Sequence, residues 1–220
     1  MADHLEIEQK FDVDTGFERP SFGGLPGVHA AAPVLHHLSA TYFDTVDGRL
    51  AASKITLRRR TGGTDEGWHL KLPADAGSRR EVHVPLGPAD REVPEALAAR
   101  VAEVTEGAAL APIARLDTER TVVTLTGRDG RVVAEVADDL VTAWRLPPSG
   151  TNAPGGGPRA PGDTGDRPTG GKQWREVEVE VPAENPELQR AAAEVLFAAG
   201  ARPAGHGSKL ARVLDESSSA

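Results

Sequence analysis

Residues 4–13 read HLEIEQKFDV, and apolar and charged side chains alternate along most of this stretch. Successive side chains of a β-strand point to opposite faces. Glu6, Glu8 and Lys10 therefore share one face of an extended chain, while Leu5 and Phe11 fall on the other. The pattern predicts a strand with one face on an apolar core and one face that carries two carboxylates and an amine.

A second stretch, WREVEVEVP at residues 174–182, repeats this alternation more strictly. Glu176, Glu178 and Glu180 share one face and lie roughly 7 Å apart from one to the next. Three like charges in a row destabilise an isolated sheet face. Such a row is favourable when cations lie between the carboxylates.

The remaining alternating segments complete a predicted all-antiparallel sheet. Strands are predicted at residues 38–44, 55–61, 67–72, 79–85, 113–126 and 132–144, the last two joined by a turn at 127–130. About eight strands without a repeating strand–helix rhythm predict an α+β fold. Its centre is a closed eight-stranded antiparallel β-barrel with a few flanking helices.

Helices and connections fit a single domain over residues 1–214. Residues 91–106 carry an apolar stripe, Asn185 and Pro186 begin a helix that runs to Gly200, and a short helix is predicted at 208–214. Residues 147–173, rich in Gly and Pro, predict a flexible surface loop. Residues 215–220 predict a disordered tail.

Composition excludes several classes of protein. The chain has 220 residues and no cysteine, which excludes disulfides, thiolate metal sites and cysteine nucleophiles. No secretory leader and no apolar span of about 18 residues is seen, so we expect no membrane association and a cytoplasmic location. The formal net charge of −8 argues against nucleic-acid binding.

The charged strand faces are sorted by sign, which is unusual for a solvated surface. Carboxylates gather on the strands at 4–13 and 174–182, and basic residues gather on the others: Arg58, Arg60, Lys71, Arg79, Arg115 and Arg120. Carboxylates suit hard cations such as Mg²⁺ or Mn²⁺, and arginine binds phosphate oxygens in bidentate fashion. Together they predict a site for a triphosphate or short polyphosphate.

These residues resemble the CYTH superfamily, also called triphosphate tunnel metalloenzymes, of the type often followed by a CHAD domain. The family signature Glu-x-Glu-x-Lys stands complete at Glu6, Glu8 and Lys10. Further segments resemble family strands in the same order: LRRR (57–60), WHLKLP (68–73), RRE (79–81), Arg120, AEVADD (134–139), WREVEVE (174–180) and SKL (208–210).

The resemblance implies one or two Mg²⁺ or Mn²⁺ ions. The implied metal ligands are Glu6, Glu8, Glu176 and Glu178, joined by either Asp138 or Asp139. Alternation along the strand places Asp139 on the same face as Glu135 and therefore favours Asp139. A β-bulge between the two positions would favour Asp138 instead. Glu6, Glu8, Lys10 and Glu178 are the implied catalytic residues.

The resemblance also implies which residues bind the phosphates. These are Lys10, Arg58, Arg60, Lys71, Arg79, Arg120 and Lys209, with Arg115 on the same strand as Arg120. Phosphoryl transfer mainly needs positioning and neutralisation of charge, so no covalent nucleophile is required. Trp68, Trp144 and Trp174 are interpreted as wall packing. For His69 and His83 two alternatives remain: the side chain lines the site, or it satisfies hydrogen bonds of neighbouring groups.

The function predicted first is metal-dependent hydrolysis of inorganic triphosphate or a related triphosphate. A class IV-type adenylate cyclase and a thiamine triphosphatase are alternatives within the same fold. The cyclase needs a purine pocket and the thiamine triphosphatase an aromatic platform. A non-catalytic polyphosphate-binding module is the alternative of another class, and complete metal-binding carboxylates favour the enzyme over it. A homodimer is one possibility.

Overall fold

The structure, a computed structural model, describes residues 3–74, 79–87, 92–147, 171–182 and 185–215, without the side chains of residues 3–7 and 182. Most of the predicted loop at 147–173 and nearly all of the predicted tail at 215–220 therefore lie outside the described residues. None of the helices in the described ranges has the length and apolarity that a membrane crossing requires.

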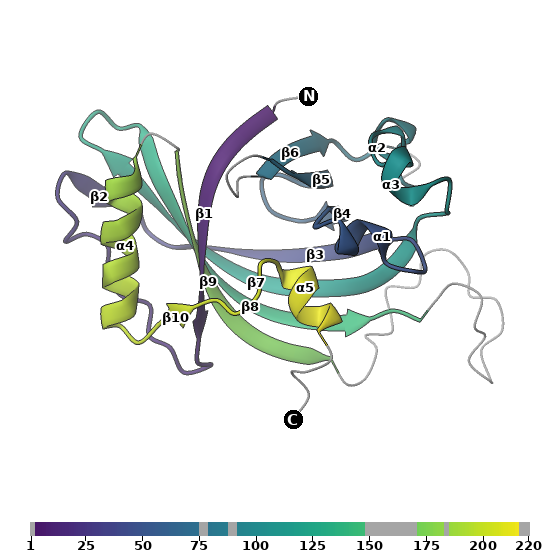
Figure 1. Ribbon diagram of the computed structural model, residues 1–220. Helices are drawn as coiled ribbons and strands as arrows, with labels where there is room; N and C mark the ends of the chain where they lie inside the picture. The colour runs from purple at the N-terminus through teal and green to yellow at the C-terminus, as the bar shows by residue number, and fades with distance from the viewer. Residues whose placement is uncertain (1–2, 75–78, 88–91, 148–170, 183–184, 216–220) are drawn as a thin grey trace.

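One antiparallel sheet dominates the molecule (Figure 1). Its strands are β1 (Asp3–Val13), β2 (Val28–Ala30), β3 (Val34–Asp44), β4 (Thr56–Thr61), β5 (Gly67–Pro73), β6 (Arg79–Val84), β7 (Ala111–Gly127), β8 (Val132–Arg145), β9 (Lys172–Pro182) and β10 (Arg202–Pro203). The longest strands, β7 and β8, form a hairpin. Its turn includes Gly130 at φ 78°, a backbone conformation that glycine adopts without strain.

The strand order is β10-β1-β6-β5-β4-β3-β7-β8-β9, with β2 beside β7. β1 pairs with β6 only through Asp3, His4 and Leu5, and pairs with β9 from Glu6 to Val13. The antiparallel α+β architecture is confirmed. The closed eight-stranded barrel is not confirmed, because the sheet has ten strands. The two extra strands, β2 and β10, are too short to leave an alternating pattern in the sequence.

The helices are α1 (Arg49–Ala52), α2 (Glu95–Arg100), α3 (Ala102–Thr105), α4 (Pro186–Ala198) and α5 (Lys209–Leu214). The single helix predicted over 91–106 is divided at Val101, whose φ of −112° leaves the helical range while its side chain packs into the core. The predicted start at Asn185 is confirmed: its side chain accepts a hydrogen bond from the Leu188 amide at 3.3 Å.

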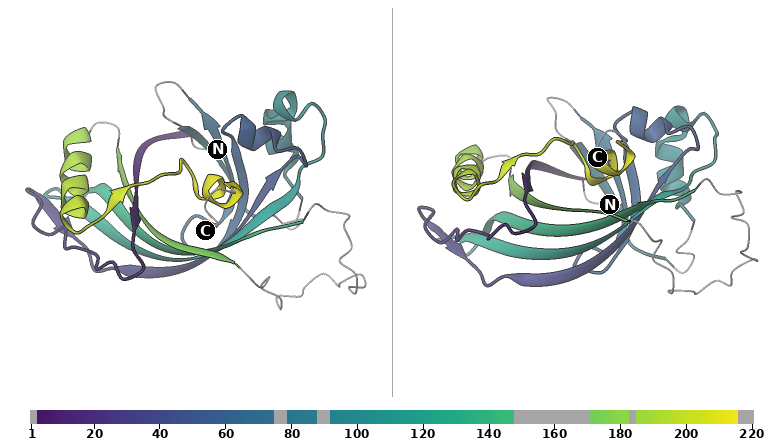
Figure 2. Two further views of the ribbon diagram at one scale, coloured as in Figure 1. Left: turned by 60° about the horizontal axis from the view of Figure 1, so that its bottom comes forward. Right: turned by 90° about the horizontal axis from the view of Figure 1, so that it is seen from below.

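Strand alternation gives the sheet two faces with different contents. One carries apolar clusters against helices: Phe11, Val177 and Val179 pack with residues of α4, and a cluster around Leu57 and Leu70 packs with α2. We call the opposite face, which carries Glu178, the inner face. Figure 2 shows that the sheet is strongly curved and that α5 lies over its concave side.

Helix α5 covers an apolar part of the inner face. Leu210 and Val213 pack against a buried cluster from β3, β7, β8 and β9: Ala40, Tyr42, Ala114, Leu116, Val141, Ala143 and Trp174. The helix begins at Ser208, whose hydroxyl accepts a hydrogen bond from the Ala211 amide at 3.0 Å. This cap fixes the first helical residue, Lys209, beside the charged part of the inner face.

Candidate active site

Three carboxylates from β8 and β9 meet on the inner face. The strand register sets Asp139 opposite Glu176 and Ala137 opposite Glu178, so the three acidic side chains point to the same side. They are 0%, 4% and 7% exposed, and one oxygen of each lies within 4.8 Å of the others. We call Asp139, Glu176 and Glu178 the acidic centre.

The ammonium group of Lys209 lies at the middle of the acidic centre. Its Nζ is 2.9 Å from Asp139 Oδ2, 2.6 Å from Glu176 Oε1 and 2.7 Å from Glu178 Oε1. Burial alone would lower the pKa of Lys209, but the three carboxylates outweigh it and raise the pKa well above its usual value. Lys209 was predicted to bind phosphate, and in this structure its partners are carboxylates.

Two further cations complete the charge balance of the acidic centre. Arg120 donates to Asp139 at 2.8 and 2.6 Å and to Glu178 at 2.6 Å. Lys10 contacts both Glu178 and Glu8. Burial would raise the pKa of Glu178, but the charges of Lys10, Lys209 and Arg120 outweigh it and hold the pKa well below its usual range. Glu178 is therefore ionised at neutral pH.

Strands β4, β5 and β6 bring cations to the inner face. Register places these residues on one side of adjacent strands, and we call them the cationic wall: Arg58, Arg60, Lys71 and Arg79. Arg58 donates to the Tyr42 hydroxyl at 3.4 Å, and Lys71 pairs with Glu81 at 3.0 Å. The buried Nε atoms of Arg58 and Arg60 find no hydrogen-bond acceptor within the described chain.

The cationic wall holds more positive charge than its acids balance. Burial, together with the charges of Arg58 and Arg120, lowers the pKa of Arg60 to about 9. The carboxylate partner of Arg60 is Asp65, which is 57% exposed and therefore a weak counter-ion. An anion such as a phosphate group would supply both the missing negative charge and the missing acceptors.

The structure resolves the open question on His69. Its Nδ1 lies 2.7 Å from Glu81 Oε1 and its Nε2 lies 2.9 Å from the carbonyl oxygen of Asp65. Both partners are acceptors, so the neutral ring donates a hydrogen bond to one of them. Burial lowers the pKa of His69 to about 4 despite the hydrogen bond to Glu81, with the charges of Arg58 and Arg60 acting in the same direction. The ring of His83 lies 4.8 Å from the ring of His69 between centroids, at a tilt of 45°.

Two residues predicted for the site lie on the opposite face of the sheet. Asp138 is buried there and accepts two hydrogen bonds from Arg175 at 2.8 Å and one from Arg19 at 3.1 Å. Arg115 lies on that face beside Asp117 at 3.3 Å. Asp139 and Arg120 lie on the inner face. The alternation of side chains along β8 is not interrupted by a bulge between Val136 and Ala143.

Other predicted ligands lie at the margin of the acidic centre or outside the description. Glu8 is exposed and contacts Lys10. Glu135 is exposed on the inner face, 3.4 Å from the Thr124 hydroxyl, and pairs in register with Glu180 rather than with the acidic centre. The side chain of Glu6 is outside the described part of the chain.

Trp174 was interpreted as wall packing, and the structure gives it a second contact. Its indole Nε1 donates to Glu176 Oε2 at 2.6 Å, and both side chains are buried. The signal was present in the alternation of residues 174–180, which places Trp174 on the same face as Glu176. An indole N–H on a carboxylate-bearing face was not weighed as a donor.

The donors of the acidic centre fit a hard divalent cation. All are carboxylate oxygens, which Mg²⁺ and Mn²⁺ prefer. One oxygen of each carboxylate faces a single cation position, now taken by the Lys209 ammonium. Oε1 of Glu176 is buried, and its contact within the described residues is the ion pair with Lys209 at 2.6 Å. The residues present therefore fit the implied metal.

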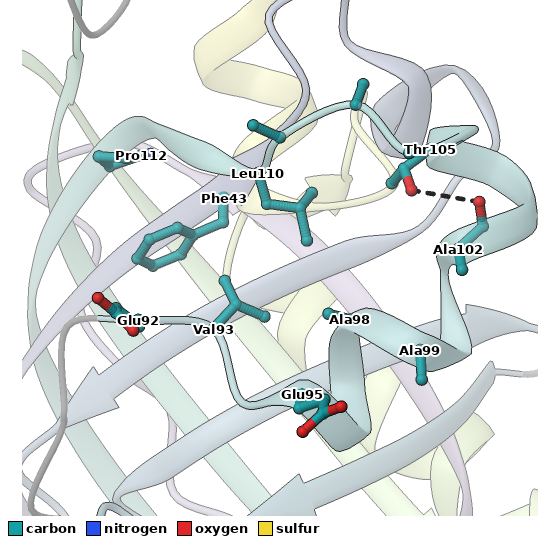
Figure 3. Close-up of a pocket in the computed structure, with 13 residues that line it drawn as sticks. Phe43, Glu92, Val93, Glu95, Ala98, Ala99, Ala102, Thr105, Leu110 and Pro112 are labelled. Atoms are coloured by element: carbon teal, nitrogen blue, oxygen red, sulfur yellow. Dashed lines mark hydrogen bonds between the residues drawn. The ribbon is translucent and has the colours of Figure 1, made fainter.

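A cavity of about 640 Å³ lies elsewhere, beside α2 and α3 (Figure 3). Its lining is mainly apolar, with Phe43, Val93 and Leu110 among the side chains and Glu92 and Glu95 at its edge. It contains none of the acidic centre or the cationic wall. We therefore place the candidate site on the inner face and not in this cavity.

Two curated relatives come from Mycobacterium tuberculosis: MT2285 of strain CDC 1551 / Oshkosh and Rv2226 of strain ATCC 25618 / H37Rv. Each is 42% identical to this chain over 223 residues, which covers 99% of this chain and 41% of the relative. The chain thus spans less than half of the length of these relatives.

Two solved structures share the fold. A candidate adenylate cyclase from Bacillus halodurans has a TM-score of 0.58 and 17% identity, covering 98% of this chain and 100% of its own. HpAC1 from Hippeastrum, a candidate adenylyl cyclase described by a dominant triphosphatase activity, has a TM-score of 0.53 and 16% identity, covering 96% and 95%. Residues 4–212 match the CYTH domain. The chain belongs to the CYTH family.

Proposed function

We propose that this chain is a metal-dependent hydrolase of inorganic triphosphate or a related triphosphate compound. The observation that carries the proposal is the meeting of two charge systems on the inner face. The acidic centre suits a divalent cation, and the cationic wall has buried arginine donors without acceptors in the described chain. A triphosphate with a bound divalent cation has the complementary charges.

Mg²⁺ or Mn²⁺ would be held by Asp139, Glu176 and Glu178, with Glu6 and Glu8 of β1 as further ligands for one or two ions. A bound divalent cation supplies charge neutralisation and an acidified water molecule as nucleophile. The phosphate chain would be bound and oriented by the basic residues of the inner face: Lys10, Arg58, Arg60, Lys71, Arg79, Arg120 and Lys209. Positioning and charge neutralisation are the main requirements of phosphoryl transfer.

An enclosed site is supported by β1, which pairs with both β6 and β9. Enclosure excludes water and strengthens electrostatic interactions with the phosphates. The dominant triphosphatase activity described for HpAC1 also supports hydrolysis rather than cyclisation. The name of the Bacillus halodurans structure keeps adenylate cyclase as a second candidate.

The test is to incubate the protein with inorganic triphosphate, ATP or thiamine triphosphate, each with Mg²⁺, Mn²⁺ or EDTA, and to measure phosphate and cyclic AMP. The proposal expects metal-dependent phosphate release from inorganic triphosphate and little from ATP. Cyclic AMP with pyrophosphate from ATP would establish the cyclase instead. Tight triphosphate binding by calorimetry without turnover would overturn hydrolysis in favour of a binding module.

A further inference from the structure

The oxygens of the acidic centre follow a common pattern. Each carboxylate turns one oxygen to Lys209 Nζ: Asp139 Oδ2, Glu176 Oε1 and Glu178 Oε1. The other oxygen of Asp139 and Glu178 accepts from Arg120, which also donates to Asp139 Oδ2 at 2.6 Å. The other oxygen of Glu176 accepts from Trp174 Nε1 at 2.6 Å. Each carboxylate is thus fixed in rotation, with one oxygen facing the cation position.

Trp174 differs from Arg120 because its donor is neutral. The acidic centre already contacts three cationic side chains, Lys10, Arg120 and Lys209. A fourth positive charge beside Glu176 would repel a divalent cation, whereas an indole N–H orients the carboxylate without that repulsion. Partners that orient a ligand in this way affect metal affinity strongly.

We infer that Trp174 is a positioning residue that holds Glu176 as a monodentate ligand and thereby sets the metal preference of the acidic centre; this rests on the proposed function. Mg²⁺ and Mn²⁺ take compact octahedral sites, whereas Ca²⁺ takes roughly six to eight oxygens and accepts bidentate carboxylates. With Glu176 Oε2 held by the indole, bidentate binding is disfavoured, and so is Ca²⁺.

The chain offers a matched control for this inference. Trp144 is also buried, at 7% exposed, and its Nε1 has no hydrogen-bond partner in the described structure. It lies on β8 opposite Arg115, on the face of the sheet opposite to the acidic centre. Trp144→Phe and Trp174→Phe remove the same atoms from two buried indoles, but only Trp174→Phe removes a donor to a carboxylate of the centre.

The experiment titrates wild type, Trp174→Phe and Trp144→Phe with Mn²⁺ alone and with Ca²⁺ alone, by calorimetry or by electron paramagnetic resonance of free Mn²⁺. For Trp174→Phe we expect Mn²⁺ affinity to fall about 10-fold. We also expect the ratio of Ca²⁺ to Mn²⁺ affinity to rise. Trp144→Phe should keep the wild-type ratio.

The possible failures are distinguishable. Equal metal affinities and equal Ca²⁺ to Mn²⁺ ratios in the two variants would overturn the role of Trp174 while leaving the metal site intact. Absence of Mn²⁺ binding by the wild-type protein would instead overturn the proposed function. Both variants could also lose thermal stability while keeping the wild-type ratio of Ca²⁺ to Mn²⁺ affinity. That result would mean that Trp174 contributes to packing only, and it would contradict the inference.

Discussion

The acidic centre and the cationic wall occupy the same inner face but differ in how their charges are satisfied. In the acidic centre, Lys10, Arg120 and Lys209 contact the carboxylates directly. In the cationic wall, the Nε atoms of Arg58 and Arg60 are buried and find no acceptor in the described part of the chain. One region is balanced internally, and the other needs an external anion.

This difference determines what a mutation should do to the fold. Removing one charge from a balanced buried network leaves its partners uncompensated, which is strongly destabilising. Removing a cation from a region with excess positive charge relieves repulsion. Loss of function should therefore accompany loss of stability in the acidic centre and should be separable from it in the cationic wall.

The largest effect is expected for Glu178→Gln. Glu178 contacts the half-buried Lys10 and Arg120 and the buried Lys209, so the neutral amide leaves these three cations without their shared partner. We expect turnover to be abolished and the free energy of unfolding to fall by about 3 kcal/mol. Denaturant unfolding and phosphate release measure the two effects. Glu119→Gln, at an exposed position of the opposite face, should change neither.

Neighbouring aspartates on opposite faces sharpen the comparison further. Asp139→Asn should weaken Mn²⁺ binding at least 10-fold, since Asp139 is a member of the acidic centre. Asp138→Asn should reduce stability by about 1–3 kcal/mol through Arg175 and Arg19 but keep the wild-type Mn²⁺ affinity. Calorimetric titration with Mn²⁺ measures this contrast. Equal loss of affinity in both variants would contradict the assignment of the two faces.

Arg60→Met tests the cationic wall. The loss of a charge-assisted hydrogen bond of about 1.5 kcal/mol should weaken binding of triphosphate roughly 10-fold. The free energy of unfolding should not fall, because burial and the charges of Arg58 and Arg120 already disfavour the charged form of Arg60. Calorimetry with triphosphate and denaturant unfolding test both parts. If Arg60→Met destabilised the fold as much as Glu178→Gln, the positive charges of the cationic wall would be neutralised within the protein, which would contradict the comparison.

The smallest effect is a pH dependence from Glu81. Burial raises the pKa of Glu81, but the hydrogen bond from His69 and the charges of Lys71 and Arg58 outweigh it and lower the pKa. The ionised form therefore stabilises the fold above the unfolded pKa of about 4.3, and this stability is lost as pH falls toward the folded value. Glu81→Gln should be less stable than wild type by about 1 kcal/mol at pH 7.

Comparing wild type with Glu81→Gln at lower pH tests whether the pKa of Glu81 is lowered or raised by folding. The stability difference between wild type and Glu81→Gln should narrow as the pH falls below about 4. Urea unfolding at pH 7 and at pH 3 measures it. A difference that widens at low pH would mean that Glu81 is protonated in the folded protein and that its ion pair with Lys71 is not formed.

Much of this arrangement could be predicted from alternation along the strands. The alternation of residues 174–180 placed Glu176 and Glu178 on one face, and the alternation of β8 places Asp139, not Asp138, on that face. Arg115 was predicted beside Arg120 because both lie on the same strand. The two residues are five positions apart, so their side chains point to opposite faces of the sheet.

Other features depend on tertiary contacts that a sequence pattern does not contain. Lys209 binds carboxylates because the cap at Ser208 and the packing of Leu210 bring α5 over the acidic centre. The ten-stranded count depends on short pairings of β2 and β10. The division of the helix at Val101, where φ is −112°, has no counterpart in the apolar stripe of residues 91–106.

The most direct test of the account is a crystal structure with Mn²⁺ and a non-hydrolysable triphosphate analogue, with Mn²⁺ located by its anomalous scattering. We predict Mn²⁺ bound by Asp139, Glu176 and Glu178, phosphates on Arg58 and Arg60, and Lys209 displaced from the carboxylates. Lys209 still among the three carboxylates, with Mn²⁺ and the analogue bound elsewhere, would contradict the account.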